Sequence, residues 1–164
     1  MEKFLKNLPE YARLNHNRFK KLVQKIKKRP PKHLDYLMGE IHQEVFEQID
    51  CLTCANCCKT TSPIVTEKDI ERIAKYLRLK PVEFIRKYLK KDTDGLWMMQ
   101  QTPCVFLGPD NYCLIYEARP KACREYPHLD RKKNIQLLNL HLKNTAICPA
   151  AFEAMSLLEK KIEF

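Results

Sequence analysis

Four cysteines lie within eight residues of this chain, in the run Cys51-Leu-Thr-Cys54-Ala-Asn-Cys57-Cys58. Two overlapping C-x2-C units place three sulfurs at three-residue intervals, close enough to reach one small positive centre. Thiolate is a soft ligand that selects zinc, copper(I) or iron–sulfur clusters over magnesium or calcium. Four further cysteines follow at wider spacing: Cys104, Cys113, Cys123 and Cys148. We therefore expect the fold to be organised around metal that is held by these eight thiols.

The composition supports metal over a disulfide framework. The 164 residues suffice for one ordinary domain, and a hydrophobic content of 45% argues against disorder. The sequence contains neither an apolar signal core near its N-terminus nor an apolar run of membrane-spanning length, which predicts a cytoplasmic protein without a transmembrane segment. In a reducing compartment, clustered cysteines indicate metal ligation or redox chemistry.

The choice of metal stays open at this level. Cys51, Cys54 and Cys57 reproduce the first three ligands of a C-x2-C-x2-C-x3-C-P iron–sulfur run, but the fourth position is Thr61. Zinc often uses two C-x2-C pairs, and no second pair follows. Neighbouring side chains diverge in a helix or a strand, so Cys57 and Cys58 either face two centres or include a spare thiol. The C-x2-C-x2-C run favours iron, as an iron–sulfur cluster such as a 4Fe–4S cluster, with zinc as the alternative.

The positive charge is concentrated at the N-terminus. Residues 1–33 carry eleven Lys and Arg against two Glu, a net charge of +9, whereas the rest of the chain has a net charge of +1. We expect residues 1–33 to form a basic, amphipathic helical leader packed on or next to a cysteine-cluster metal-binding domain over 34–164. Such a leader either presents a solvated lysine face or binds an acidic protein, a nucleic acid or an anionic membrane surface.

The apolar periodicity predicts mostly helix. Helical spacing over 10–29 ends at Pro30-Pro31, and a second apolar stripe runs over 34–49. A capping-box variant at Thr66–Asp69 predicts the start of another helix, and Pro81 the start of the next. A final helix is expected from Pro149.

Short strand-like runs occupy the middle of the chain. Segments 96–99, 104–107 and 112–116 are apolar, and the turn residues 108–111 between the last two predict a small hairpin. Residues 133–143 are compatible with either strand or helix. The fold class predicted is mainly α with a small β-hairpin element, as a single cysteine-rich, metal-organised domain.

Several segments together resemble a known family. The C-x2-C-x2-C-C run, Thr66-Glu-Lys-Asp-Ile-Glu-Arg-Ile-Ala74, Cys104-Val-Phe-Leu107, Cys113-Leu-Ile-Tyr-Glu-Ala-Arg-Pro120 and Cys123-Arg-Glu-Tyr-Pro127 look like the YkgJ-like cysteine-cluster proteins. The resemblance covers roughly residues 50–150, in matching order. It implies a zinc- or iron-chelating domain, often labelled an iron–sulfur protein.

The resemblance also implies the site residues. All eight cysteines would form the metal-binding set, and Arg119, Arg124 and Tyr126 match the family motif as residues next to the metal or cluster. Guanidinium groups there would offset thiolate charge and donate hydrogen bonds to sulfur. Family members commonly have glycine where this chain has Ala55.

Three functional classes remain open from the sequence. The first, which we favour, is a metal-binding or redox module. The second is an enzyme, an oxidoreductase or a relative of the flagellin lysine methylases that carry a similar cluster, although no glycine-rich nucleotide loop supports it. The third is a zinc-stabilised adaptor that binds RNA or an acidic partner through residues 1–33.

Overall fold

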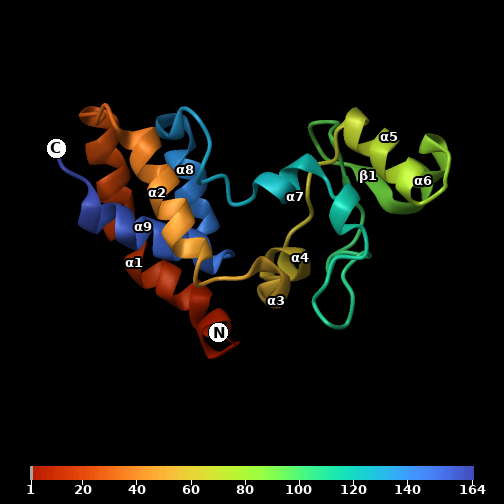
Figure 1. Ribbon diagram of the computed structural model, residues 1–164, viewed down its shortest axis with the longest axis horizontal. Coiled ribbons are helices and arrows are strands. Elements are labelled where there is room, and N and C mark those ends of the chain that lie inside the picture. The colour runs from red at the N-terminus through yellow and green to blue at the C-terminus, as the bar shows by residue number, and fades with distance from the viewer. Residues whose placement is uncertain (1) are drawn as a thin grey trace. The chain divides into compact units, whose positions relative to one another are not determined.

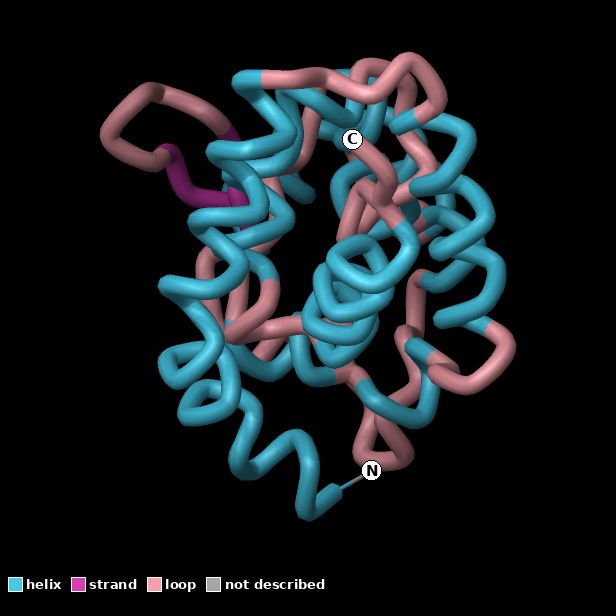
Figure 2. Tube along the Cα trace, turned by 90° about the vertical axis from the view of Figure 1, so that its left-hand side faces the viewer, coloured by secondary structure: helices cyan, strands magenta, loops and turns pink. Residues whose placement is uncertain are grey.

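The computed structural model describes residues 2–164, with side chains from Phe4 onward; Met1, the first residue of the predicted leader, lies outside them. This part of the chain is mainly helical, and its paired strands are confined to one hairpin (Figure 2). The fold class predicted from the sequence is confirmed. The elements are α1 (Glu2–Lys28), α2 (Leu34–Phe46), α3 (Cys51–Cys54), α4 (Asn56–Thr60), α5 (Glu67–Tyr76), α6 (Pro81–Tyr88), β1 (Leu89–Lys91), β2 (Trp97–Met99), the 3-10 helix η1 (Tyr116–Ala118), α7 (Lys121–Glu125), α8 (Asn134–Asn144) and α9 (Pro149–Lys161).

The chain divides into two compact units. Met1–Asp50 and Pro127–Phe164 form one, called here the helical unit, and Cys51–Tyr126 form the other, the cysteine unit. None of the helices over residues 2–164 combines the length and the apolar character needed to cross a membrane. The predicted domain boundary at residue 33 stays a prediction.

Four helices build the helical unit. Figure 1 shows α1, α2, α8 and α9 packed against one another, and each of α1 and α2 contacts both α8 and α9. The buried apolar residues of α1 follow one helical face: Leu8, Ala12, Phe19, Leu22, Val23 and Ile26. Phe19 meets Phe152 of α9 edge to face, with ring centroids 5.5 Å apart.

The helix boundaries follow local sequence signals. Helix α1 ends at Lys28, directly before Pro30-Pro31, as expected. At its other end it continues past Pro9 to Glu2, so it is longer than the periodic stretch over 10–29. Residues 134–144 are helical, which resolves the ambiguous segment before Pro149.

A polar network fixes the start of α8 inside the helical unit. The Asp35 carboxylate on α2 accepts hydrogen bonds from the backbone N–H groups of Lys133 and Asn134, both at 2.8 Å. These are donors that a helix N-terminus leaves unsatisfied. Asn134 Nδ2 donates to the carbonyls of Leu129 and Arg131, so its Oδ1 must accept from His141 Nε2 at 2.8 Å. Nε2 of His141 therefore carries a proton.

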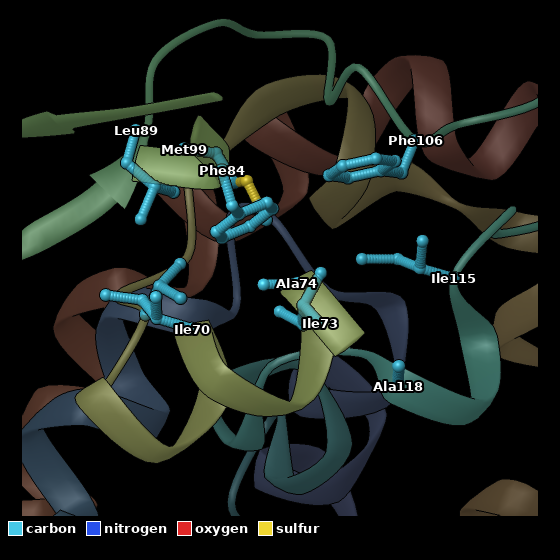
Figure 3. Packing of buried hydrophobic residues seen from close by; sticks show 10 residues of the cluster. Ile70, Ile73, Ala74, Phe84, Leu89, Met99, Phe106, Ile115 and Ala118 are labelled. Atoms are coloured by element: carbon cyan, nitrogen blue, oxygen red, sulfur yellow. The ribbon is translucent and has the colours of Figure 1, made fainter. Parts of the chain in front are cut away.

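The core of the cysteine unit lies between α5, α6, the hairpin and the segment around η1. Ile70 and Ile73 of α5 point towards Phe84 of α6 and Met99 of β2 (Figure 3). The remaining core residues are Val65, Ala74, Leu89, Phe106, Ile115 and Ala118. Cys104 and Cys113 pack against this cluster, so the apolar core also supports two of the predicted ligands.

The hairpin lies earlier in the chain than the turn residues suggested. Strands β1 and β2 pair antiparallel with Leu89 opposite Met99, and the predicted strand over 96–99 supplies β2. The segments predicted to pair around 108–111 retain one antiparallel bridge, between Leu107 and Cys113. Tyr116 continues instead into η1, which turns the chain away from further pairing.

The buried Asp69 carboxylate joins three parts of the cysteine unit. It accepts from Thr66 N and Thr66 Oγ1 in the predicted capping box, at 3.0 and 2.7 Å. It also accepts from Arg72 at 2.5 Å and from the Lys121 backbone N–H at 3.0 Å. Arg72 donates in turn to the Arg119 carbonyl at 2.8 Å. The start of α5 and the start of α7 are thereby tied to one side chain.

We predict that Asp69→Asn lowers the free energy of unfolding of the cysteine unit by about 3 kcal/mol, because a buried ion pair is broken and buried donors lose their acceptor. Burial raises the pKa of Asp69, but the hydrogen bonds from Thr66, Arg72 and Lys121 outweigh it and hold that pKa below its usual range. Urea unfolding followed by the fluorescence of Trp97 measures the change. The exposed neighbour Glu71→Gln is the matched control and should stay within about 0.5 kcal/mol of the wild type. A loss below about 1 kcal/mol for Asp69→Asn would contradict the prediction.

We predict that buried His141 makes the stability of the helical unit sensitive to acid. Burial, reinforced by the charge of His128, lowers the pKa of His141 to about 4 from an unperturbed 6.5. As the pH falls from 6.5 to about 4, the imidazole of His141 becomes protonated in the unfolded chain but stays neutral in the folded chain. Up to about 3 kcal/mol of stability is therefore lost across that window and is present above it. Amide hydrogen exchange in α8 and α9 at pH 7 and pH 4.5 measures the loss. His141→Gln, which can still donate to Asn134, should shrink it, whereas the exposed His16→Gln should leave it unchanged.

Candidate metal centre

The C-x2-C-x2-C-C run folds into two short helices that meet at Ala55. Helix α3 carries Cys51 and Cys54, and α4 carries Cys57 and Cys58. Between them Ala55 adopts the left-handed conformation, with φ 48° and ψ 17°, and is buried. That conformation costs a residue with a Cβ roughly 1–2 kcal/mol and suits glycine. It gives a physical reason for the glycine that is common at this position in the family resembled.

Thr61, at the position where a ferredoxin-type run has its fourth cysteine, caps α4 instead. Its hydroxyl donates to the Cys57 carbonyl at 2.8 Å, and its backbone N–H donates to the same oxygen at 2.9 Å. The residue therefore satisfies a carbonyl that the end of the helix leaves free. Thr61 thus has a structural role at the end of the helix.

The loop over 104–113 supplies two further thiols and is attached to the cysteine run. The Cys104 N–H donates to the Cys58 carbonyl at 2.8 Å. The loop closes on itself through the Leu107–Cys113 bridge and a 2.8 Å bond from Gly108 N to Tyr112 O. A Cβ at Gly108 would lie 2.7 Å from Asp110 Oδ1 and 3.1 Å from that same Tyr112 oxygen, so the close approach needs glycine.

Asn111 makes a second attachment between the loop and the cysteine run. Its Nδ2 donates to the Thr53 carbonyl on α3 at 3.0 Å, across 58 positions of sequence. Asn111 has φ 68°, a left-handed conformation that asparagine tolerates better than most residues. The two attachments, one to α3 and one to α4, hold the loop against both halves of the cysteine run.

Cys123 lies on α7, whose start is anchored by Asp69. Arg119 lies between η1 and α7. It donates from Nη1 to the Tyr116 carbonyl at 2.6 Å, and its guanidinium carbon lies 3.7 Å from the centre of the Tyr116 ring. Burial raises the pKa of both Cys113 and Cys123, and the positive charge of Arg119 opposes part of that rise. Arg119 therefore stabilises its own turn and also supplies positive charge to two thiols.

The thiols influence one another's ionisation. Burial raises the pKa of Cys104 and of Cys113, and a charge on Cys58 raises both further. For Cys123, burial together with charges on Cys58, Cys104 and Cys113 raises the pKa to about 12. These four side chains, from α4, the 104–113 loop and α7, therefore share one electrostatic environment that opposes full ionisation without a cation.

Cys58 differs from the others because it ionises first. A hydrogen bond from the Cys57 side chain, helped by the charge of Lys59, lowers the pKa of Cys58 to about 7 against the effect of burial. Burial instead raises the pKa of Cys54, and a charge on Cys58 adds to that effect. Near neutral pH the first thiolate of the group is therefore available on Cys58.

The remaining predicted residues are distributed as follows. Cys51 is exposed at the start of α3, Arg124 is exposed on α7, and Tyr126 ends α7. Cys148 belongs to the helical unit, where it is buried at the start of α9. Among the side chains described, from Phe4 onward, no three of His, Cys, Asp or Glu converge closely enough to hold a single ion. The ligand roles of the eight cysteines, and those of Arg119, Arg124 and Tyr126, stay predictions.

Asp69 and Asn111 were not identified as site residues from the sequence. The capping-box pattern marked Asp69 as a helix start, but it carried no sign of the bond to Lys121. Asn111 stood in a run of turn residues, where an asparagine is expected for its conformation alone. Their roles depend on contacts between distant segments, which local patterns do not contain.

The comparisons with known proteins assign the chain to a family. A family model described as "CxxCxxCC: Putative zinc- or iron-chelating domain" matches residues 50–148, more than half of the chain. The chain belongs to this family. Membership in the CxxCxxCC family supports metal binding through the cysteine motif, with zinc or iron as the metal.

One curated relative carries no assigned activity. An uncharacterized protein of Methanocaldococcus jannaschii, MJ0661, is 31% identical over 90 residues, which are 53% of this chain and 48% of the relative. The chain thus spans about half the length of that relative. No solved structure matches the chain.

We predict that Asn111→Ala lowers the affinity of the centre for Zn²⁺ or Co²⁺ by roughly 10-fold, because supporting residues around a metal site typically contribute 10- to 100-fold. Asn111→Gly removes the same hydrogen bond but relaxes the left-handed backbone, so it separates the bond from the conformation. Competition titration with a chromophoric chelator measures the affinity. Unchanged affinity in both variants would contradict a positioning role for Asn111, and a loss in Asn111→Ala alone would assign the effect to the backbone.

Proposed function

We propose that this protein binds iron as an iron–sulfur cluster through the thiols of the cysteine unit, and acts as a metal-binding or redox module. The observation that carries the proposal is the attachment of the 104–113 loop to the cysteine run, through the bond from Cys104 N to the Cys58 carbonyl at 2.8 Å. Charge effects among Cys58, Cys104, Cys113 and Cys123 support it. Four soft donors from three separate segments meet the ligand count of an ordinary four-thiolate centre. Cys51, Cys54 and Cys57 lie outside this four-thiol group, but their C-x2-C-x2-C spacing matches three ligands of an iron–sulfur run and so supports iron over zinc in the cysteine unit.

The chemistry of the donor set fits such a group. The thiols are partly buried, and a charge on Cys58 raises the pKa of Cys104, Cys113 and Cys123, so a bound cation would remove the repulsion and hold them as thiolates. A cluster would supply a positive core and, through iron, one-electron chemistry. The Arg119 guanidinium would offset part of the negative charge that four thiolates bring.

The proposal divides the cysteines of the cysteine unit into two groups. We assign Cys58 to the four-thiol group and keep Cys51, Cys54 and Cys57 as a second set of soft donors. A cytoplasmic location belongs to the same proposal, because reduced cysteines persist in a reducing compartment.

Zinc is the second candidate, since a structural zinc site also takes four thiolates. Under that alternative the metal stabilises the cysteine unit and carries no redox activity. The enzyme hypothesis, whether as an oxidoreductase or as a methylase relative, would require an open ligand position or a pocket for a substrate beside the metal.

We expect the full chain, purified without oxygen, to contain iron and sulfide and to show broad visible absorption that bleaches on reduction. Metal analysis and the visible spectrum provide the measurement. Cys58→Ser and Cys123→Ser should each remove most of the iron, because a four-thiolate centre loses a ligand, while the exposed Thr60→Ser serves as the matched control and should retain it. A colourless protein that contains zinc alone would overturn the iron–sulfur proposal and support the zinc alternative.

A further inference from the structure

The exposed side of α1 carries a straight line of cations. Lys6, Arg13, Lys20 and Lys27 follow one another at intervals of seven residues, and all four are exposed. Seven residues advance a helix by about 10.5 Å and nearly two full turns, so these side chains lie on one edge of α1 over about 31 Å. Lys21 and Lys28, also exposed, run beside them.

Other cations of α1 are already engaged and are not part of this line. Arg18 pairs with Glu159 of α9 at 3.1 Å. Lys25 lies over the ring of Phe164, with Nζ 3.7 Å from its centre. The line is thus a distinct feature of the solvent side of α1, separate from the contacts that hold α1 in the helical unit.

The apolar side of α1 is occupied within the helical unit. Its buried residues, from Leu8 to Ile26, pack in the core, and Phe4 meets Phe152 with ring centroids 6.0 Å apart. A basic amphipathic helix binds a bilayer by burying its apolar face in the lipid. Because α1 already uses that face, an interfacial membrane helix is disfavoured.

A groove beside the line adds further positive charge. It lies in the helical unit between α1 and the end of α8, with a volume of about 370 Å³. Arg13 and His16 of α1 and Lys143 of α8 contribute its basic groups, and Asn17 and Thr145 its neutral polar groups. Its lining residues include no carboxylate and no Phe, Tyr or Trp ring.

We propose that this face of α1, with the adjoining groove, binds the phosphodiester backbone of a double-stranded nucleic acid. Backbone recognition is carried by Lys and Arg contacts to phosphates and needs no apolar anchor. A protein partner would be held mainly by buried aromatic or apolar anchors, which the line lacks. Single strands are usually held by bases that stack on a series of Phe, Tyr or Trp rings, and the groove contains none of these. The length of the line matches about one turn of a duplex, roughly 34 Å.

The experiment measures binding of the full, metal-loaded chain to fluorescent 24-base-pair duplexes of RNA and of DNA by anisotropy, over a series of salt concentrations. Substitution is preferable to deletion of residues 1–33, because α1 supplies part of the buried core. The test variant is Lys6→Gln/Arg13→Gln/Lys20→Gln/Lys27→Gln. The matched control removes four exposed cations of the cysteine unit: Lys68→Gln/Lys75→Gln/Arg86→Gln/Lys90→Gln. Circular dichroism checks that both variants retain the helical content of the wild type.

We expect the logarithm of the wild-type affinity to fall linearly with the logarithm of the salt concentration. In the test variant, the affinity at low salt should drop at least about 100-fold and the slope should shrink by roughly 3 to 4, near 0.9 for each phosphate that the variant no longer neutralises. The control variant should lose less than about 10-fold. Preference for one duplex over the other would distinguish RNA from DNA while leaving the surface assigned.

Three results would overturn the proposal. One is the absence of salt-dependent duplex binding by the wild type. Another is an equal loss in the two variants, which would assign the effect to net charge alone. The last is tighter binding to vesicles that contain phosphatidylserine than to either duplex, which would favour a membrane surface. Metal loading is measured separately on each variant, so failure of this proposal is distinguishable from failure of the iron–sulfur proposal.

Discussion

The Asp69 carboxylate accepts hydrogen bonds from the start of α5, from Arg72 and from the start of α7, and it is almost fully removed from solvent. A buried carboxylate is tolerated only when such donors replace the water that burial removes. Its partners come from segments about fifty residues apart, so their positions are coupled. Because α7 carries Cys123, the position of this predicted ligand depends on Asp69, whose hydrogen bonds here include none to a thiol.

The helical unit depends on a comparable arrangement, in which Asp35 and His141 fix α8 from either side of Asn134. Helix α1 belongs to the same packed unit, and its apolar residues share a core with those of α9. Its strong positive charge is therefore displayed on a rigid helix whose orientation is set by packing. A flexible basic tail would have to be ordered on binding, at an entropic cost that this helix avoids.

The sequence predicted those features that depend on near neighbours. A helix ends before Pro30, another begins at Pro149, and a capping box lies at Thr66–Asp69. Each of these features depends on residues a few positions apart, and each was predicted. The hairpin was predicted too late in the chain, since apolar runs beside a turn do not specify whether they pair. The cysteine run predicted a metal site, but the thiols that share the environment of Cys58 depend on the bonds from Cys104 to Cys58 and from Asn111 to Thr53. Bonds across such distances are a property of the folded chain.

Ala55 has a further consequence for the evolution of the cysteine run. Glycine has many conformations in the unfolded chain and therefore loses more entropy on folding. Alanine has fewer conformations in the unfolded chain, but at a left-handed position it is sterically strained in the folded chain. Such strain persists only where the surroundings enforce the backbone. In chains with alanine here, the surrounding contacts must therefore hold the strained backbone in place. The loop that Asn111 attaches to α3 is one of these contacts. Drift at residues 104–113 should then be more restricted in chains with alanine than in those with glycine.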